Sequence, residues 1–131
     1  MTTLVLDAGA LIALDRNDRA AWALLRVAAD SDRSVHVPAG AIAQAWRNGR
    51  RQALLSRALR RCDEVPLDGP LARAVGLLCG ASRTADIVDA SVAIVAAGRA
   101  RSGDVGIATS DRDDISHLLA TLGVAARIID V

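Results

Sequence analysis

Short apolar runs alternate with longer helical segments, and this alternation constrains the fold of the 131-residue chain more than any other feature. The clearest runs are residues 3–7, 34–37 and 105–109. A strand buried on both faces reads as a continuous apolar run, and consecutive parallel strands need a crossover segment between them. The sequence therefore predicts an α/β fold with a central, mostly parallel sheet and helices on both faces. The length predicts a single domain over residues 1–131.

The predicted elements follow from apolar runs, capping residues and breaks. Strands are expected at residues 3–7, 34–37, 65–67, 105–109 and 125–129. Helices are expected at residues 8–15, 18–29, 39–46, 50–61, 68–78, 86–101 and 111–122. Asp18 and Asp68 are the expected N-caps of two of these helices, Asn48-Gly49 is a break, and Gly123 ends the last helix.

Composition excludes some classes of protein. The net charge of +1 gives no bulk charge that would by itself predict nucleic-acid binding. All 16 basic residues are arginine, whose planar guanidinium can bind phosphate through two hydrogen bonds. No apolar run reaches the roughly 18 residues of a membrane span, and no signal peptide is recognisable. We therefore expect a cytoplasmic protein with no membrane contact, in which Cys62 and Cys79 are reduced and buried.

Four aspartates are the candidate site residues. Asp7 ends the first apolar run, and Asp111 follows the run at 105–109. Ligands of a parallel sheet bind beyond the carboxyl ends of its strands, where both would lie. Asp86 and Asp89 are three residues apart and share one face of an otherwise apolar helix. Four carboxylates that converge would repel each other unless a cation joined them, so the pattern favours a divalent-metal site.

Simpler interpretations remain open for each acid. Asp7, Asp86 and Asp111 could be helix N-caps, and the pair Asp86 and Asp89 could lie on a solvated strip. Thr109 and Ser110 either donate hydrogen bonds to the acids or are ordinary helix-start hydroxyls.

The two histidines, His36 and His117, are isolated in the sequence. His36 is in a predicted strand between apolar neighbours, and His117 is in a predicted helix. We expect both to have structural or surface roles.

The segments that carry the aspartates, residues 3–12, 86–90 and 109–115, together with residues 37–49, resemble the PIN domain in order and spacing. The resemblance covers essentially the whole chain, and among PIN proteins it is greatest to the VapC toxins of bacterial toxin–antitoxin pairs. It implies a three-layer α/β/α sandwich and a Mg²⁺- or Mn²⁺-dependent endoribonuclease that cleaves structured RNA of the tRNA or rRNA class. It also implies a cognate VapB-like antitoxin and a homodimer. Under this resemblance the metal ligands are Asp7, Asp86, Asp89 and Asp111, and the catalytic set adds Gln44.

Gln44 is a departure from the family pattern. Many PIN nucleases place a glutamate on the helix after the second strand, where this chain has Gln44. An amide oxygen can still coordinate a metal or hold a water, but it contributes no charge. The alternative function is therefore a catalytically weak or inactive PIN module that binds RNA or protein. A third hypothesis, a phosphoacceptor receiver domain, usually needs a late lysine, and the chain has no lysine.

Arginines concentrate between residues 47 and 61. The run consists of Arg47, Arg50, Arg51, Arg57, Arg60 and Arg61, of which the first three are spaced to share a helix face. It is either a solvated helical face or a surface that holds RNA backbone or an acidic antitoxin tail. Trp22 and Trp46 are the sole aromatic residues, so we do not expect extensive base stacking. We expect an apolar antitoxin segment to lie along the helices of residues 38–61.

Overall fold

The centre of the molecule is a sheet of five parallel strands. The computed structural model describes residues 2–131. Its strands are β1 (Thr3–Leu6), β2 (Ser34–Pro38), β3 (Asp63–Val65), β4 (Val105–Thr109) and β5 (Arg127–Asp130). They are ordered β3-β2-β1-β4-β5, and every neighbouring pair is parallel. The predicted α/β class is confirmed, and within residues 2–131 the sheet is parallel throughout.

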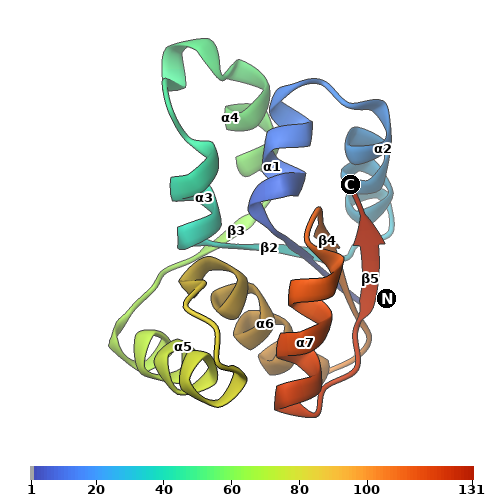
Figure 1. Ribbon diagram of the computed structural model, residues 1–131. Coiled ribbons are helices and arrows are strands. Elements are labelled where there is room, and N and C mark those ends of the chain that lie inside the picture. The colour runs from blue at the N-terminus through green and yellow to red at the C-terminus, as the bar shows by residue number, and fades with distance from the viewer. Residues whose placement is uncertain (1) are drawn as a thin grey trace.

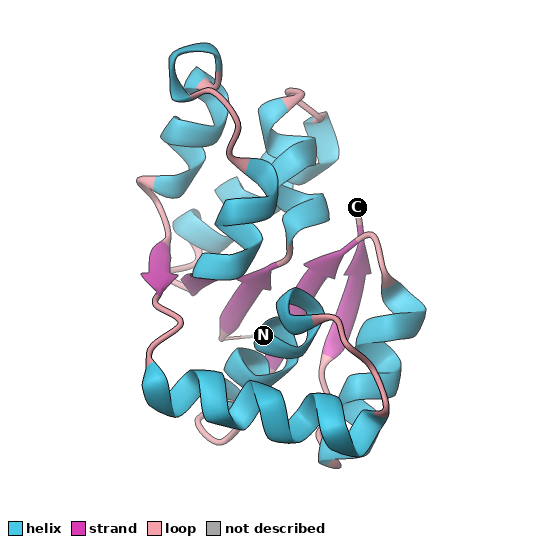
Figure 2. Ribbon diagram, turned by 60° about the vertical axis from the view of Figure 1, so that its left-hand side comes forward, coloured by secondary structure: helices cyan, strands magenta, loops and turns pink. Residues whose placement is uncertain are grey.

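Helices cover both faces of this sheet (Figures 1 and 2). They are α1 (Ala8–Asp15), α2 (Arg19–Asp30), α3 (Ala39–Ala45), α4 (Ala53–Leu59), α5 (Gly69–Ser82), α6 (Ile87–Ala100) and α7 (Arg112–Leu122), with a short 3₁₀ turn at Gly49–Arg51. One core joins the sheet to α1–α4 and includes Leu4, Leu11 and Leu55. The other joins it to α5–α7 and includes Ile107 and Ile115. The three-layer α/β/α arrangement is therefore confirmed.

The strand order places a topological switch point in the middle of the sheet. From β1 the chain moves to β2 and β3 on one side, and it returns on the other side of β1 with β4 and β5. The loops that leave β1 and β4 therefore diverge to opposite faces and open a crevice at the carboxyl edge, where ligands of such sheets bind. Asp7 follows β1 directly, and Asp111 lies two residues after β4.

Most predicted elements are found close to their expected bounds. Asp18 and Asp68 are N-caps as predicted, since their carboxylates accept hydrogen bonds from Ala21 N at 2.9 Å and Leu71 N at 2.9 Å. Gly123 ends α7 in the left-handed conformation, with φ of 68°, which glycine adopts without steric cost. Local signals of this kind suffice because each acts within a few residues of the boundary that it sets.

Two predicted elements are wrong in detail. The helix expected at 50–61 is interrupted at Gln52, whose side chain is buried and accepts hydrogen bonds from Arg47 N and Asn48 N at 2.8 and 2.9 Å. The strand expected at 65–67 lies instead at Asp63–Val65. It is an edge strand of three residues whose register against β2 is fixed by backbone pairing, with His36 opposite Asp63, and not by an apolar pattern.

The two cysteines and the two histidines differ in burial and in contacts. Cys62 and Cys79 are free, and both are half-buried where full burial was expected. His36 is 3% exposed, and neither ring nitrogen has a hydrogen-bond partner among the described residues, although Nδ1 lies 3.9 Å from Asp63 Oδ2. Burial lowers the pKa of His36, so the imidazole is neutral. The His117 ring bonds to Ser82 O at 2.8 Å.

Among residues 2–131 there is no helix with the length and hydropathy of a membrane span.

Candidate metal centre

Three carboxylates meet at the switch point. One oxygen from each of Asp7, Asp89 and Asp111 lies within 4.8 Å of the other two. They come from the end of β1, the first turn of α6 and the start of α7, so residues about a hundred positions apart converge. Asp7 and Asp89 are buried, at 1% and 4% exposure, whereas Asp111 is exposed. The cluster therefore has a buried floor and one side that is open to solvent.

Asp7 is fixed by hydrogen bonds to both of its carboxylate oxygens. Oδ1 accepts from Ala8 N at 2.6 Å, and Oδ2 accepts from the Thr109 hydroxyl at 2.7 Å. Burial raises the pKa of the Asp7 carboxyl, and these two hydrogen bonds oppose that rise by stabilising the ionised form. Asp7 thus partly caps α1, as one interpretation of the sequence allowed, and still directs its carboxylate into the cluster.

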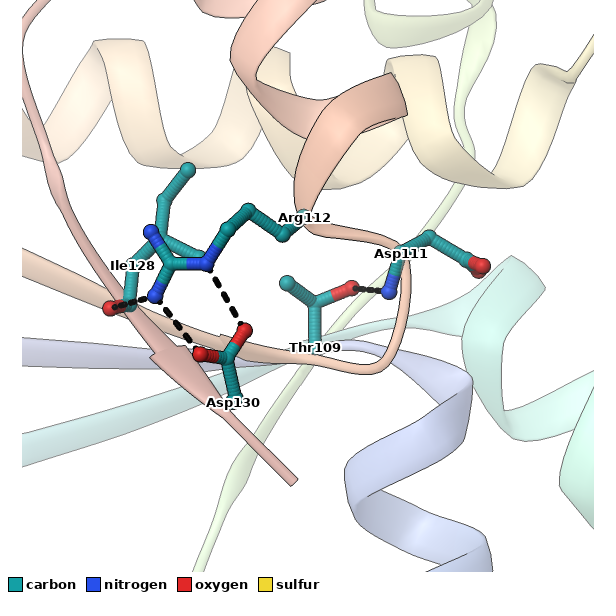
Figure 3. A network of polar contacts seen from close by, with 5 residues as sticks. All are labelled: Thr109, Asp111, Arg112, Ile128 and Asp130. Carbon is teal, nitrogen blue, oxygen red and sulfur yellow. Dashed lines mark hydrogen bonds and ion pairs between the residues drawn. The ribbon is translucent and has the colours of Figure 1, made fainter.

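Thr109 joins two of the three acids. Its side chain is fully buried, and its hydroxyl donates to Asp7. The same hydroxyl accepts a hydrogen bond from Asp111 N at 2.9 Å (Figure 3). Asp111 occupies the N-cap position of α7, but its side chain makes no capping hydrogen bond. The Asp111 carboxylate is therefore not consumed by the helix, which argues against the simple capping interpretation of this residue.

An ion pair holds the start of α7, beside Asp111, against strand β5. The Arg112 guanidinium donates from Nε and from one terminal nitrogen to the two oxygens of Asp130, at 2.9 and 2.8 Å (Figure 3). It also donates to Ile128 O at 3.0 Å. These contacts tie the loop after β4 to the edge strand β5. Because the pair is exposed, we assign it a role in orientation and little in stability.

Gly9 allows α1 to approach the loop that carries Asp111. A Cβ atom built on Gly9 would lie 2.8 Å from Ser110 Cβ and 3.1 Å from Ser110 N, and it would also collide with the Ser110 hydroxyl. These separations are shorter than van der Waals contact. The glycine in the motif after Asp7 is thus needed for close packing between two segments that carry metal-ligating candidates.

Within the cluster, ionisation is least favourable at the Asp89 carboxyl. Its carboxylate accepts no hydrogen bond from any residue between 2 and 131, and burial together with the charges of Asp7, Asp86 and Asp111 raises its pKa from 3.8 to about 7. Near neutral pH this site therefore holds a proton on a fraction of the molecules. A cation would replace that proton and remove the repulsion.

Asp86 and Asp89 have different roles although they share a helix face. Asp86 is exposed, and its Oδ1 accepts a hydrogen bond from Asp89 N at 2.9 Å, so it is the N-cap of α6. It is not part of the three-carboxylate cluster. Its charge nevertheless raises the pKa of both Asp7 and Asp89. The predicted role of Asp86 as a metal ligand stays a prediction.

Gln44 is exposed on α3, and its side chain forms no hydrogen bond with a described residue. Gly40, one turn earlier on α3, packs against Val88 of α6, since a Cβ atom added to Gly40 would lie 3.4 Å from Val88 Cγ2. This contact places α3 beside the helix that carries Asp89. The role of Gln44 also stays a prediction.

The donor set fits a hard divalent cation. Mg²⁺ and Mn²⁺ prefer oxygen ligands, and Mg²⁺ is usually held by one or two carboxylates while it keeps several waters. Asp7, Asp89 and Asp111 supply such oxygens, and the exposed side of the cluster leaves room for waters and a substrate oxygen. No cysteine or histidine joins the cluster among the described residues, which disfavours a zinc site.

We expect Thr109→Val to weaken metal binding by roughly tenfold to a hundredfold, a range typical of residues that orient ligands. Valine keeps the shape of threonine but leaves Asp7 Oδ2 and Asp111 N without their shared partner. Titration calorimetry with Mn²⁺ measures the change. Thr121→Val is the matched control, because Thr121 is exposed and its hydroxyl bonds only to His117 O within α7. Equal affinities for the two variants would contradict the bridging role.

Two contributors to the site are not identified by sequence reasoning. In the sequence Gly9 stands only as part of a motif, and its close approach to Ser110 depends on two segments that lie far apart in the chain. Arg112 likewise stands only in a motif, and its partner Asp130 is 18 residues away on another element. An acid-Ala-Gly sequence at a strand end offers a weak signal for Gly9, but no local signal identifies Arg112.

Solved structures share this fold over nearly the whole chain. One is a chain of VapBC2 from Rickettsia felis, bound to a DNA fragment from its promoter, with a TM-score of 0.66, 11% identity and coverage of 98% of both chains. Another is a chain of FitAB bound to the IR36 DNA fragment, with a TM-score of 0.60, 15% identity and coverage of 97% of this chain and 94% of that one. No protein-family model and no curated protein matches the sequence. At these identities the likeness is one of fold.

Proposed function

We propose that this chain, which has the PIN-like fold of VapC-type proteins, is the toxin of a toxin–antitoxin pair and a divalent-metal-dependent endoribonuclease. The observation that carries the proposal is the cluster of Asp7, Asp89 and Asp111 at the switch point of the sheet. The fold shared with VapBC2 and FitAB supports it, and so does the sequence resemblance to VapC toxins. The proposed substrate is structured RNA of the tRNA or rRNA class, and the proposed location is the cytoplasm.

The residues of the cluster would have different roles in hydrolysis. Asp7 and Asp89 form the buried floor that would hold Mg²⁺ or Mn²⁺, and Asp111 closes the site from the exposed side. When bound, the ion would lower the pKa of a water for attack on phosphorus and offset negative charge on the phosphoryl oxygens. Thr109 holds Asp7 and the backbone of Asp111 in fixed positions, so little reorganisation is needed when the substrate arrives.

The direct test is cleavage of total tRNA and rRNA by the purified chain with Mn²⁺, with Mg²⁺ and with EDTA. We expect fragments with either metal, faster formation in Mn²⁺, and none in EDTA. Asp7→Ala should remove cleavage, because it deletes a carboxylate from the floor of the cluster. Asp68→Ala, which removes only the cap of α5, is the matched control and should leave cleavage unchanged. Cleavage that survives Asp7→Ala would contradict the proposal.

Gln44 discriminates between a working nuclease and the alternative, a catalytically weak or inactive PIN module that binds RNA or protein. If Gln44 weakens a functional site, Gln44→Glu should lower the Mn²⁺ concentration for half-maximal cleavage by roughly threefold to tenfold, because it adds a negative charge near the ion. The same substitution in the Asp7→Ala background should stay inactive. If the site has adapted to glutamine, the new carboxylate raises a neighbouring pKa, and cleavage stays flat or falls. If both proteins are inert at saturating Mn²⁺ but still bind RNA or a partner, the alternative holds.

An apolar groove between α3 and α4 is the proposed binding site for a VapB-like antitoxin. The groove has a volume of about 610 Å³ and is lined by Ala39, Ile42, Ala43, Trp46, Ser56, Leu59, Arg60 and Glu64. Trp46 is 40% exposed there, so part of its indole ring is free to contact a partner. A photo-crosslinking residue at position 46 should capture the antitoxin, and one at position 27, where Val27 is exposed on α2, should not. Capture at Val27 alone would contradict this placement.

We also propose that the chain forms a homodimer, as the resemblance to VapC toxins implies. Sedimentation equilibrium should then give about twice the 13.6 kDa mass of one chain. A monomer at all concentrations would contradict this proposal without bearing on the metal site.

A further inference from the structure

A second polar pocket lies away from the carboxylates, between α2 and α4. Its volume is about 560 Å³, within the range of small-molecule sites. It is lined by Asn17, Arg19, Trp22, Ala23, Arg26, Leu54, Arg57 and Arg61. Four of its eight lining residues are arginines and none is acidic. The pocket is therefore strongly positive although the whole chain has a net charge of only +1.

Helical spacing gathers these arginines from two elements. Arg19, Trp22 and Arg26 follow one another at intervals of three and four along α2 and so share a face. Arg57 on α4 and Arg61 just beyond its end come from the opposite side of the pocket. The arginine run between residues 47 and 61 is thus divided between surfaces, since Arg57 and Arg61 line this pocket and Arg60 lines the groove between α3 and α4.

These four arginines have no side-chain partner among the residues that the structure describes. None of Arg19, Arg26, Arg57 and Arg61 forms an ion pair or a side-chain hydrogen bond with any residue from 2 to 131. Two arginines elsewhere do have partners: Arg47 donates to Ala43 O and Trp46 O at the end of α3, and Arg112 pairs with Asp130. Four unpaired cations around one pocket repel each other, and a bound polyanion would remove that repulsion.

Trp22 adds an aromatic wall to the pocket. Its indole Nε1 donates to Leu14 O at 3.0 Å, which fixes the ring and uses its one polar atom inside the protein. The half-buried remainder that lines the pocket is therefore apolar π-surface. Arginines beside a fixed aromatic ring are the arrangement with which proteins bind single-stranded nucleic acid, since the arginines contact phosphates and the ring stacks on a base.

We propose that this pocket is an RNA-binding subsite, in which Arg19, Arg26, Arg57 and Arg61 hold the backbone and Trp22 stacks on one unpaired base. The inference rests on the proposed function for the identity of the RNA as substrate. The subsite and the metal-site candidates lie toward opposite ends of α1, whose eight residues span about 12 Å. The pocket therefore holds the RNA a few nucleotides from the bond that is cut.

The aromatic wall favours RNA over an acidic protein segment. A segment of aspartates and glutamates would satisfy the arginines and leave Trp22 without a matching surface. A nucleotide presents a phosphate and a planar base together, so it matches both features of the pocket. A single tryptophan accommodates one base, which agrees with the shortage of aromatic residues in the chain.

The test measures RNA binding without cleavage. A labelled single-stranded oligoadenylate of about twelve nucleotides, within the range that such sites cover, is titrated with the whole protein in EDTA and followed by fluorescence anisotropy. Arg57→Gln with Arg61→Gln should weaken binding by at least roughly tenfold and reduce the slope of log K against log salt by about 1.4, which corresponds to two phosphate contacts on a single strand. Arg73→Gln with Arg101→Gln removes the same charge from α5 and the end of α6 and should have little effect.

Substitutions of Trp22 separate stacking from folding. Trp22→Phe keeps an aromatic face and loses the bond to Leu14 O, whereas Trp22→Leu loses the face as well. We expect Phe to retain RNA affinity within about threefold and Leu to lose roughly tenfold, both in proteins shown to be folded by circular dichroism. If Phe and Leu weaken binding equally, stacking is not the cause, and the proposal is wrong.

Two further outcomes would overturn the assignment. One is equal loss of RNA affinity in the Arg57/Arg61 and Arg73/Arg101 variants, which would mean that only overall charge matters. The other is binding of a labelled oligoglutamate peptide that depends on Arg57 and Arg61 while RNA binding does not, which would assign the pocket to an acidic protein segment.

The binding test and the cleavage test can fail independently, because binding is measured in EDTA, where metal-dependent cleavage does not occur. If the pocket binds RNA but the protein cleaves none with Mn²⁺, the subsite is supported and the nuclease proposal is contradicted. If the protein cleaves RNA but the pocket variants bind RNA as well as the wild type, the nuclease proposal is supported and the subsite is contradicted.

Discussion

Asparagine in place of Asp89 should make the metal-free protein more stable at pH 8 and should at the same time weaken Mn²⁺ binding on the order of 100-fold. Asp89 is 4% exposed, and its carboxylate lacks a hydrogen-bond donor among residues 2–131. Ionising it in the folded state is therefore unfavourable. Asparagine removes the charge at the cost of a buried amide, so we expect a net gain of about 1–3 kcal/mol in the free energy of unfolding.

The direction of the pH dependence follows from the raised pKa. Unfolding returns Asp89 to its ordinary value near 3.8, while in the folded protein its pKa is about 7. The folded state binds the proton more tightly, so this group's contribution to stability is complete below about pH 4 and is lost as the pH rises to about 7. Urea unfolding in EDTA at pH 5 and pH 8 should show this loss in the wild type and a smaller one in Asp89→Asn.

The matched control for Asp89→Asn is Asp113→Asn, which removes the same charge from an exposed position in the first turn of α7. We expect it to lower stability slightly, because an acid there interacts favourably with the helix dipole, and to bind Mn²⁺ nearly as well as the wild type. Calorimetry in parallel with unfolding gives both quantities. An Asp89→Asn protein that is less stable than the wild type in EDTA at pH 8 would contradict the electrostatic description of the cluster.

Alanine in place of Gly9 should destabilise the protein by about 1–3 kcal/mol and weaken Mn²⁺ binding by at least roughly tenfold. The added methyl group would meet Ser110 at its side chain and its backbone nitrogen, and the backbone contact at 3.1 Å cannot be relieved by a change of rotamer. The loop after β4 must then move away from α1 and take Asp111 with it. Thermal unfolding and calorimetry measure the two effects.

Gly98→Ala is a control that should change the stability in the opposite direction. Gly98 is also a helix residue, on α6, and an added Cβ there meets no atom within 4 Å. Alanine at this position should stabilise the protein by roughly 0.5–1 kcal/mol through its higher helix propensity and should leave metal binding unchanged. If Gly9→Ala behaves like Gly98→Ala, the contact between α1 and Ser110 has no role in the site.

The elements that sequence reasoning locates well are those with local signals. A continuous apolar run marks β4 at Val105–Thr109, and α2 and α5 begin where Asp18 and Asp68 cap them. β3 lies away from its predicted position because an exposed edge strand of three residues has no such run. The helix expected at 50–61 is too long because Gln52 resembles a surface residue in sequence, while in the structure it is buried and bonds to four groups.

The sequence predicts where the candidate site lies in the sheet better than it predicts the contacts of the individual side chains. That Asp7 and Asp111 follow central strands is enough to place them at one edge of the sheet. Sequence does not tell which of Asp86 and Asp89 turns inward, because both lie on one helix face and the choice depends on how α6 packs. Nor does it show that a single Thr109 hydroxyl contacts two acids, since that contact depends on the pairing of β1 with β4.

The pairing of β1 with β4 also governs when the site can exist during synthesis. Thr3 lies opposite Val105, and the backbone of Asp7 bonds to Ala108 O at 3.0 Å, so the first strand is completed by a segment made about a hundred residues later. Contacts so distant in sequence close slowly, because a long loop must be ordered before they form. A nascent chain therefore carries Asp7 without the neighbours that would let it hold a cation. The proposed nuclease would in this way stay inert until the segment that carries Asp111 has left the ribosome.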